Sequence, residues 1–276
     1  MADTKAAAGN PLPQVRNVIA VGAGKGGVGK STIAVNLAVA LAQMGHRTGL
    51  MDGDIYGPSM PTMLGIRGVT PEIKEGRLIP TFVHGIHAVT IGSLVEADKP
   101  LIWRGPMAHS AFKQLLVDQT QWPELDYLIV DLPPGTGDVP LSLCQLLPLK
   151  GAVIVATPQR VALDDAVRAV AMFRTLNTAV LGIVENMSYF VQLDGSVADI
   201  FGRGGAQTAA QKMGIPFLGE LPMFPELRVN SDAGRPLANF EGPQQLKDCL
   251  ATIAANVLAQ VNLQSSQRPE IQMNVE

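Results

Sequence analysis

Short aliphatic runs with few polar interruptions recur along the whole chain. A run of four or five such residues, without alternation of polar and apolar positions, is typical of a strand buried on both faces of a sheet. The pattern therefore predicts a set of buried strands. The runs cover residues 18–21, 48–51, 87–91, 127–130, 152–156, 180–184 and 217–221.

Between several of these runs, apolar residues return with the spacing of an amphipathic helix. We expect helices over residues 33–44, 107–117, 163–176 and 244–261. In the third helix, Val167, Val170, Ala171 and Phe173 are expected on the inner side. The apolar face of the last helix is expected to carry Leu246, Cys249, Leu250, Ile253, Val257 and Val261.

Alternation of buried strands and helices is typical of an α/β fold, a doubly wound, mostly parallel sheet with helices on both faces. Ligands of such sheets bind at the carboxyl ends of the strands. We expect one domain over residues 15–263, with a Pro- and Gly-rich stretch over the surface at 57–80. Residues 1–14 and 264–276 lack a packing pattern and are expected to be flexible tails.

The composition narrows the class of protein. Hydrophobic residues make up 47% of the 276 residues, which is enough for a large core, and only 5% are aromatic, so aliphatic packing dominates. The net charge of −3 gives no basic field and predicts no nucleic-acid partner. No apolar run approaches the ~18 residues of a membrane span. Two cysteines cannot form a disulfide framework, and together these features predict a soluble cytoplasmic protein.

A glycine-rich segment after the first run carries the clearest chemistry. Its first eight residues fit G-x-x-x-x-G-K-[ST], the pattern of a phosphate-binding loop. The alternative is an ordinary glycine turn, but a strand before the segment and a helix after it are the context that a phosphate loop requires. The segment consists of Gly24, Lys25, Gly26, Gly27, Val28, Gly29, Lys30, Ser31 and Thr32.

The chemistry of each residue type in the loop explains why it suits phosphate binding. Gly26, Gly27 and Gly29 allow the backbone to curl so that successive N–H groups point at phosphate oxygens. Lys30 can reach the β- and γ-phosphates, and Ser31 offers its hydroxyl to Mg²⁺. The helix that follows adds the positive end of its dipole.

Two acidic segments follow later strands. Asp54, in the stretch 52–54, can hold Mg²⁺ through water or orient an attacking water, although two aspartates in an ordinary turn are the alternative. Asp131 suits the acid that supports the Mg²⁺ shell. Pro134 and Gly135 follow it, and their Gly/Pro mixture suits a switch segment that senses a γ-phosphate.

The early lysine of the loop carries a resemblance to a known class. Lys25 precedes the glycines, as in the deviant phosphate loop (a deviant Walker A motif) of the MinD/ParA/nitrogenase-iron-protein class. That resemblance implies a homodimer in which the lysine reaches across to the partner's nucleotide. On its own, Lys25 could equally be a solvated loop charge.

Longer strings narrow the resemblance to the Mrp/ApbC branch, ATPases implicated in carrying iron–sulfur clusters. It extends over about residues 17–238. The strings are Asp-Gly-Asp-Ile-Tyr-Gly-Pro-Ser at 52–59, Trp-Arg-Gly-Pro-Met at 103–107, Leu-Pro-Pro-Gly-Thr-Gly-Asp at 132–138, Glu-Asn-Met-Ser at 185–188 and Ile-Phe-Gly-Arg-Gly-Gly at 200–205.

The resemblance implies roles for individual residues. Residues 26–32 would bind the phosphates and Mg²⁺, Lys25 would act in trans, and Asp54 would assist the attacking water. Asp131 would support Mg²⁺. Asn186 would contact the adenine edge together with backbone near Pro222, although an Asn beside a turn is also a common structural residue.

The chain departs from the branch where the cluster ligands are expected. Members that carry clusters usually have Cys-x-x-Cys after the Glu-Asn-Met-Ser string, whereas residues 189–196 here contain no cysteine. Cys144 and Cys249 lie in apolar stretches and are interpreted as small core residues. His84 and His87 have ligand spacing but no evident third ligand. A cluster is therefore possible, with ligands not identified in this chain.

The sequence thus predicts a homodimeric, Mg²⁺-dependent ATPase with slow turnover. By resemblance it would assemble or transfer iron–sulfur clusters, with apoproteins or scaffold proteins as partners. The alternative is a regulatory or positional switch like MinD or ParA, without a cluster. Residues 268–276 lack the basic amphipathic helix of a membrane-cycling version, and no Lys/Arg run supports DNA partitioning. A biosynthetic ligase with the same loop is a third reading, which Lys25 disfavours.

Overall fold

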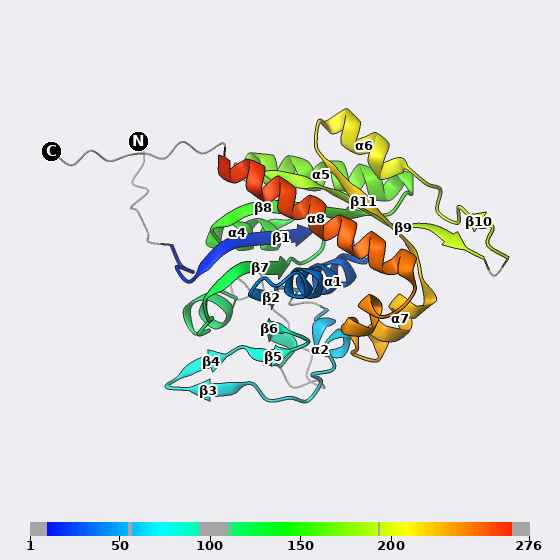
Figure 1. The fold of residues 1–276 in the computed structure, drawn as a ribbon. Helices are drawn as coiled ribbons and strands as arrows, with labels where there is room; N and C mark the ends of the chain where they lie inside the picture. Colours follow the sequence, from blue (N-terminus) through cyan, green and yellow to red (C-terminus); the bar gives the residue numbers. More distant parts are fainter. Residues whose placement is uncertain (1–9, 55–56, 94–109, 111, 193, 267–276) are drawn as a thin grey trace, which may run out of the picture.

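The computed structural model describes residues 10–54, 57–93, 110, 112–192 and 194–266 (Figure 1). The Trp-Arg-Gly-Pro-Met string at 103–107 lies outside the described residues, as do residues 55–56 of the Asp-Gly-Asp string. Most of the two expected tails, residues 1–9 and 267–276, also lies outside.

Eleven strands form in the described part of the chain, and nine of them belong to one sheet. The strands of this sheet are β1 (Val15–Gly22), β2 (Thr48–Asp52), β5 (Thr81–Val83), β6 (Ile86–Thr90), β7 (Leu125–Asp131), β8 (Leu149–Ala156), β9 (Val180–Val191), β10 (Val197–Ala198) and β11 (Phe217–Met223).

The spatial order of the sheet is β10-β9-β8-β1-β7-β2-β6-β5, and β11 pairs with β9 beside this path. All central pairs are parallel, whereas β5 and β10 join their neighbours in antiparallel orientation. A separate hairpin, β3 (Glu72–Lys74) and β4 (Arg77–Ile79), lies within the Pro- and Gly-rich stretch. The mostly parallel sheet confirms the predicted fold class.

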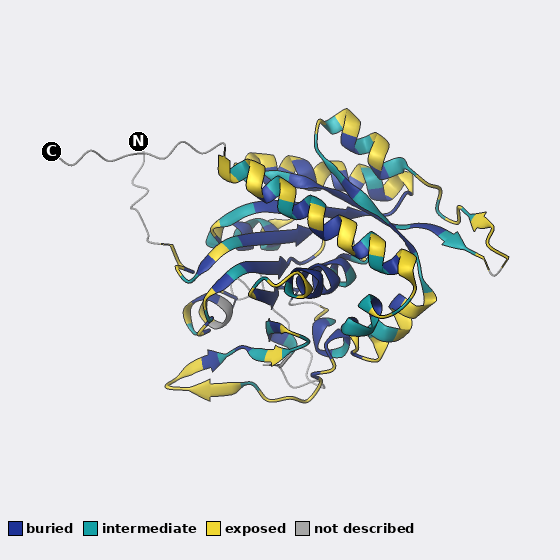
Figure 2. Cartoon of the chain, viewed as in Figure 1, coloured by how far each residue is buried: buried dark blue, intermediate teal, exposed yellow. Residues whose placement is uncertain are grey.

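Helices cover the sheet on both sides, so that its central strands are the most buried part of the molecule (Figure 2). They are α1 (Lys30–Gln43), α2 (Met60–Met63), α4 (Asp138–Leu146), α5 (Arg160–Thr175), α6 (Gly205–Met213), α7 (Pro225–Asp232) and α8 (Gln244–Ser266). Three further helical segments, which are not α-helices, are η1 (Ile91–Ser93), η2 (Lys113–Asp118) and η3 (Pro236–Phe240).

Alternate residues of each central strand enter two different cores. In β1, Ile19 and Val21 pack with α1 and α8, whereas Val18 and Ala20 pack with α4, α5 and α6 on the opposite face. Because both faces are covered, a central strand needs no polar alternation. This explains why the strands appear in the sequence as continuous aliphatic runs.

The structure corrects the predicted inner side of α5. Val170 and Phe173 are buried as expected, but Val167 is 46% exposed and Ala171 is also exposed. The buried face is completed by Ala162, Ala166 and Ala169 instead. Small alanine side chains allow the helix to approach the sheet closely, so hydrophobicity by itself did not identify the face.

The packed region also extends beyond the predicted domain limits. Leu12 is fully buried although it lies in the stretch expected as an N-terminal tail, and the Gln14 carbonyl accepts a hydrogen bond from the Leu125 amide. At the other end, α8 continues to Ser266. None of the helices in the described part of the chain has the length and apolarity that crossing a bilayer requires.

Candidate nucleotide-binding site

The phosphate loop and the two acidic segments meet at one edge of the sheet. The loop connects β1 to α1, Asp131 ends β7, and Asp52 ends β2. Asp131 pairs in register with Val21 on one side and with Asp52 on the other. Since these strands are parallel, their carboxyl ends lie together, which is where ligands bind in this type of sheet.

Lys30 and Ser31 are both bound to Asp131. The Lys30 ammonium lies 2.5 Å from Asp131 Oδ1, and the Ser31 hydroxyl donates to Asp131 Oδ2 over 2.6 Å. Asp54 Oδ2 lies 3.7 Å from Lys30 Nζ. Only 6% of the Lys30 side chain and none of the Asp131 side chain is exposed. Burial raises the pKa of Asp131, and the Lys30 ammonium opposes that shift.

Asp52 supports this cluster, although no separate role was predicted for it. It is fully buried and accepts hydrogen bonds from the Thr90 hydroxyl at 2.7 Å and from the Asp54 amide at 3.1 Å. Burial raises the pKa of Asp52 to about 7, and the charge of Asp131 adds to the increase. Asp52 therefore fixes the backbone that carries Asp54.

The loop itself is shaped by close contacts that only glycine permits. Gly29 has a φ of 82°, in the left-handed region, and a Cβ at this position would collide with the Asn186 amide nitrogen. That nitrogen donates to the Val28 carbonyl over 2.8 Å. Asn186, on β9, is thus brought against the loop from a distant part of the sequence.

The two loop lysines have contrasting surroundings. Lys30 is buried and ion-paired, whereas Lys25 is partly exposed and has no ion pair or hydrogen bond within the described part of the chain. The described residues therefore leave its ammonium available to a further partner. Beside it, the Asp165 carbonyl leaves no room for a side chain at Gly24.

The predicted switch segment contacts the start of the loop. The Gly135 amide donates to the Ala23 carbonyl over 2.9 Å, and Gly135 has a φ of 96°. Pro134, immediately before it, is exposed. A segment anchored by one backbone hydrogen bond at a glycine can change conformation at low cost.

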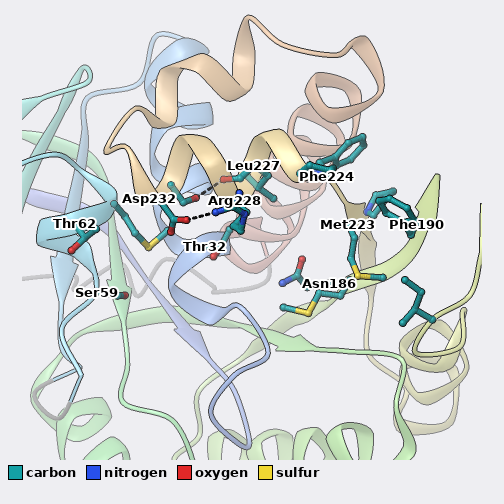
Figure 3. Close-up of a pocket in the computed structure, with 16 residues that line it drawn as sticks. Thr32, Ser59, Thr62, Asn186, Phe190, Met223, Phe224, Leu227, Arg228 and Asp232 are labelled. Atoms are coloured by element: carbon teal, nitrogen blue, oxygen red, sulfur yellow. Dashed lines mark hydrogen bonds and ion pairs between the residues drawn. The ribbon is translucent and has the colours of Figure 1, made fainter. Parts of the chain in front are cut away.

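A cavity of about 830 Å³ lies beside the loop (Figure 3). Thr32, Asn186 and Pro222 line it, so the structure brings together three residues that the sequence assigned to nucleotide binding. In Figure 3, Thr62 of α2 and Ser59, just before that helix, lie on one side of the α7 side chains, and Asn186, Phe190 and Met223 lie on the other. Much of the wall is apolar: Met63, Met187, Phe190, Ile200, Pro222, Met223, Phe224 and Leu227.

Sequence reasoning missed one whole wall of this cavity. Leu227, Arg228, Ser231 and Asp232 of α7 line it, and Arg228 and Asp232 form an ion pair at 2.7 Å. The i, i+4 spacing of this pair is the ordinary pattern of an exposed helix. No signal in the sequence distinguished α7 from other surface helices.

The candidate cluster ligands are scattered. Cys144 is buried in α4, where burial raises the pKa of its thiol to about 12, and Cys249 is half-buried on α8. His84 contacts the Leu64 carbonyl at 3.0 Å, and the His87 ring lies against Phe82. Within residues 10–54, 57–93, 110, 112–192 and 194–266, no three His, Cys, Asp or Glu side chains form a group that could hold a metal.

The donors near the loop do fit Mg²⁺ completed by phosphate. Mg²⁺ prefers hard oxygen ligands and is usually bound through one or two side chains together with substrate phosphates and water. The Ser31 hydroxyl and the Asp131 and Asp54 carboxylates are oxygen donors gathered around Lys30. This donor set has the chemistry that a magnesium–nucleotide site needs.

A parallel sheet whose first strand leads through a glycine loop into a helix, with acids at the neighbouring strand ends, defines a P-loop nucleoside triphosphatase. Residues 14–258 match the ParA family model described as NUBPL iron-transfer P-loop NTPase. The chain belongs to this family, which confirms the resemblance found in the sequence.

Relatives named iron–sulfur cluster carrier protein match most of the chain. The Synechocystis sp. protein is 48% identical over 256 residues, covering 91% of this chain and 72% of that relative. The Deinococcus radiodurans protein is 49% identical over 269 residues, covering 96% and 76%. The Escherichia coli protein is 46% identical over 257 residues, covering 92% and 69%.

Solved structures show the same fold. The nucleotide-binding protein of Archaeoglobus fulgidus, solved in complex with ADP, is 36% identical with a TM-score of 0.75, covering 87% of this chain and 94% of that one. The cell division ATPase MinD of Pyrococcus furiosus is 20% identical with a TM-score of 0.67, covering 88% and 98%. The second likeness concerns the fold alone.

Proposed function

We propose that this protein is a Mg²⁺-dependent ATPase that works as a homodimeric switch in iron–sulfur cluster transfer. One observation carries the proposal. Lys30, Ser31, Asp54 and Asp131 form a single cluster beside a cavity of about 830 Å³. That combination provides a phosphate site and a nucleoside site next to each other.

The phosphates bind on the loop between β1 and α1. The loop amides and the Lys30 ammonium neutralise phosphate charge, and the N-terminus of α1 adds its dipole. The base occupies the cavity between Asn186 and the backbone near Pro222, against the apolar side chains of the wall. The relative from Archaeoglobus fulgidus, solved with ADP, supports a nucleotide as the ligand.

Ser31, Asp131 and Asp54 would hold Mg²⁺, Asp131 and Asp54 acting from its outer shell. When bound, Mg²⁺ supplies charge neutralisation at the phosphate oxygens. Asp54 orients the attacking water, and its backbone is fixed for this task by Asp52. Pro134 and Gly135 respond to the terminal phosphate, because Gly135 contacts the start of the loop.

Lys25 completes the opposite site of the dimer. Its ammonium has no partner within the described residues, and a second cation at the transferring phosphoryl group stabilises the charge that develops there. The nucleotide state thereby controls the association of two chains. A switch of this kind needs only slow turnover of ATP.

The cluster is the cargo of this switch, and its ligands come at least in part from an apoprotein or scaffold partner. Iron–sulfur clusters are held by thiolates. The chain has two cysteines, and burial raises the pKa of both thiols. Relatives named as cluster carriers support the cargo.

The nucleotide assignment is tested by calorimetric titration of the purified protein with ATP, with and without Mg²⁺, together with phosphate release. We expect one ATP per chain and hydrolysis that requires Mg²⁺. Asp54→Asn should bind ATP and lose hydrolysis, since the carboxylate acts on the water. A wild-type protein that neither binds nor hydrolyses ATP would refute the proposal.

The source of the cluster ligands is tested by iron and acid-labile sulfide analysis after anaerobic reconstitution. We expect substoichiometric iron and sulfide in the isolated protein and the same values in Cys249→Ser. Stoichiometric iron and sulfide that disappear in Cys249→Ser would contradict this expectation and place the cluster on Cys249 of two chains.

A further inference from the structure

Three asparagine side chains form a continuous chain of hydrogen bonds from the phosphate loop to the α7 wall of the cavity. Asn36 Nδ2 donates to the Thr32 carbonyl over 2.8 Å. Asn239 Nδ2 donates to Asn36 Oδ1 over 2.8 Å, and Asn230 Nδ2 donates to Asn239 Oδ1 over 2.9 Å. The amides belong to α1, η3 and α7 respectively.

The direction of this asparagine chain is fixed by its first member. The Thr32 carbonyl can only accept, so Asn36 must present its amide nitrogen there and its oxygen to Asn239. The same reasoning then orients Asn239 toward Asn230. Asn36 is 1% exposed and Asn239 is fully buried, so neither could exchange these partners for water without cost.

One end of the asparagine chain lies at the proposed nucleotide site, and the other end lies on the helix that forms one wall of its cavity. Thr32 lines the cavity directly. At the other end, Asn230 lies on α7, whose Leu227, Arg228, Ser231 and Asp232 form a cavity wall (Figure 3). The position of α7 relative to the phosphate loop is therefore set by three hydrogen bonds and not by apolar packing alone.

A second contact holds the segment that follows α7, close to Asn230 in the sequence. Gly234, just after the helix, lies so close to Gly65, just after α2, that a side chain at Gly234 would collide with the Gly65 backbone. Because α2 also lines the cavity, this contact fixes α7 to α2, whereas the asparagine chain fixes α7 to the phosphate loop. Within the described residues, the Asn230–Asn239 and Asn239–Asn36 bonds are the only side-chain hydrogen bonds that connect α7 to α1 by way of η3.

We infer that Asn36, Asn239 and Asn230 are positioning residues for the nucleoside half of the ligand. They hold α7 at the distance from the loop that lets one nucleotide fill the phosphate site and the cavity together. This inference rests on the proposed nucleotide site. It predicts that weakening the asparagine chain lowers affinity for the nucleoside portion and leaves phosphate binding intact.

The test compares ATP with inorganic tripolyphosphate, which presents phosphates without a base or ribose. Asn230→Ala removes the outer, half-buried link and is compatible with a helix. We expect its dissociation constant and KM for ATP to rise about fivefold, the factor that corresponds to one net hydrogen bond of about 1 kcal/mol. Its kcat and its affinity for tripolyphosphate should stay within about twofold of wild type.

Asn256→Ala is the matched control. Like Asn230→Ala, it removes one half-buried asparagine. Asn256 lies on α8, away from the cavity, and its amide donates to the Leu218 carbonyl over 3.0 Å. We expect neither ligand to be affected. Asn239→Leu, which removes both hydrogen bonds of the central asparagine, should show the effect of Asn230→Ala more strongly in whatever fraction folds.

The outcomes separate the inference from the proposed function. Unchanged ATP affinity and KM in Asn230→Ala would overturn the inference, as would equal weakening of ATP and tripolyphosphate or a change in kcat alone. A wild-type protein that does not bind ATP would overturn the proposed function itself. A rise in KM with kcat and tripolyphosphate affinity retained would establish the positioning role.

Discussion

Replacing Lys30 with alanine is expected to abolish nucleotide binding and to destabilise the fold at the same time. Lys30 is 6% exposed, and its ammonium lies 2.5 Å from the fully buried Asp131 carboxylate. Removing one partner of a buried ion pair leaves an uncompensated charge, which costs about 3 kcal/mol or more. The lost contact to phosphate should weaken ATP binding at least about a hundredfold, or roughly 2.7 kcal/mol.

These two effects of Lys30→Ala can be separated with a second substitution. In Lys30→Ala/Asp131→Asn, both charges of this ion pair are removed, and the asparagine oxygen can still accept from Ser31. We expect denaturant unfolding to show recovered stability, whereas calorimetry still shows no ATP binding. Lys212→Ala, at an exposed site in α6, is the control for loss of one positive charge.

Tight ATP binding by the double variant would show that Lys30 does not contact the nucleotide. Wild-type stability of Lys30→Ala would show that the ion pair with Asp131 contributes nothing to the fold. The first result would contradict the role of Lys30 in nucleotide binding, and the second would contradict its role in stability. Each role is tested independently of the other.

Lys25→Ala should behave in the opposite way. Lys25 is partly exposed and unpaired within the described residues, so we expect normal folding and normal ATP binding. Hydrolysis should fall by about 10³, the lower end of the effect of a cation supplied in trans to a transferring phosphoryl group. Light scattering should show that ATP no longer drives dimer formation.

A mixing experiment distinguishes a lysine that acts in trans from one that acts in its own site. Asp54→Asn lacks the group that orients water but still carries Lys25, and Lys25→Ala has the reverse defect. A mixed dimer contains one site with Asp54 from one chain and Lys25 from the other. The mixture should therefore regain hydrolysis that neither variant shows by itself.

No recovery on mixing, in the presence of demonstrated mixed dimers, would place Lys25 in the site of its own chain. Normal turnover by Lys25→Ala would remove the lysine from the mechanism altogether. Because Lys25→Ala leaves the buried cluster intact, a loss of hydrolysis in this variant cannot be attributed to unfolding.

The sequence could predict those parts of the candidate site whose residues are close together along the chain. Gly24 to Thr32 are contiguous and run from the loop into the first turn of α1, Asp131 ends β7, and Asp54 follows the end of β2 by two residues. Local spacing is enough to recognise such elements, because strand, loop and helix each impose their own periodicity. Asn186 required the family resemblance, and the structure then placed it against Val28.

The structure was needed where contacts join distant segments. Asn36 and Asn239 are 203 residues apart, and nothing near Asn239 in the sequence indicates a partner on α1. Asn36 offered a partial signal, since it is a polar residue within the apolar stretch from Ile33 to Leu41. The inner face of α5 was likewise decided by how closely alanines let that helix approach the sheet.

The sequence by itself determined the class of fold, the phosphate loop and the family of this protein, because these depend on periodicity and on a motif of adjacent residues. Only the tertiary structure decided that Lys30 and Ser31 share Asp131, that α7 forms a wall of the cavity, and that three asparagines connect this wall to the loop. The physical reason is that parallel strands bring together residues a hundred or more positions apart, and their side-chain contacts leave no periodic pattern along the chain.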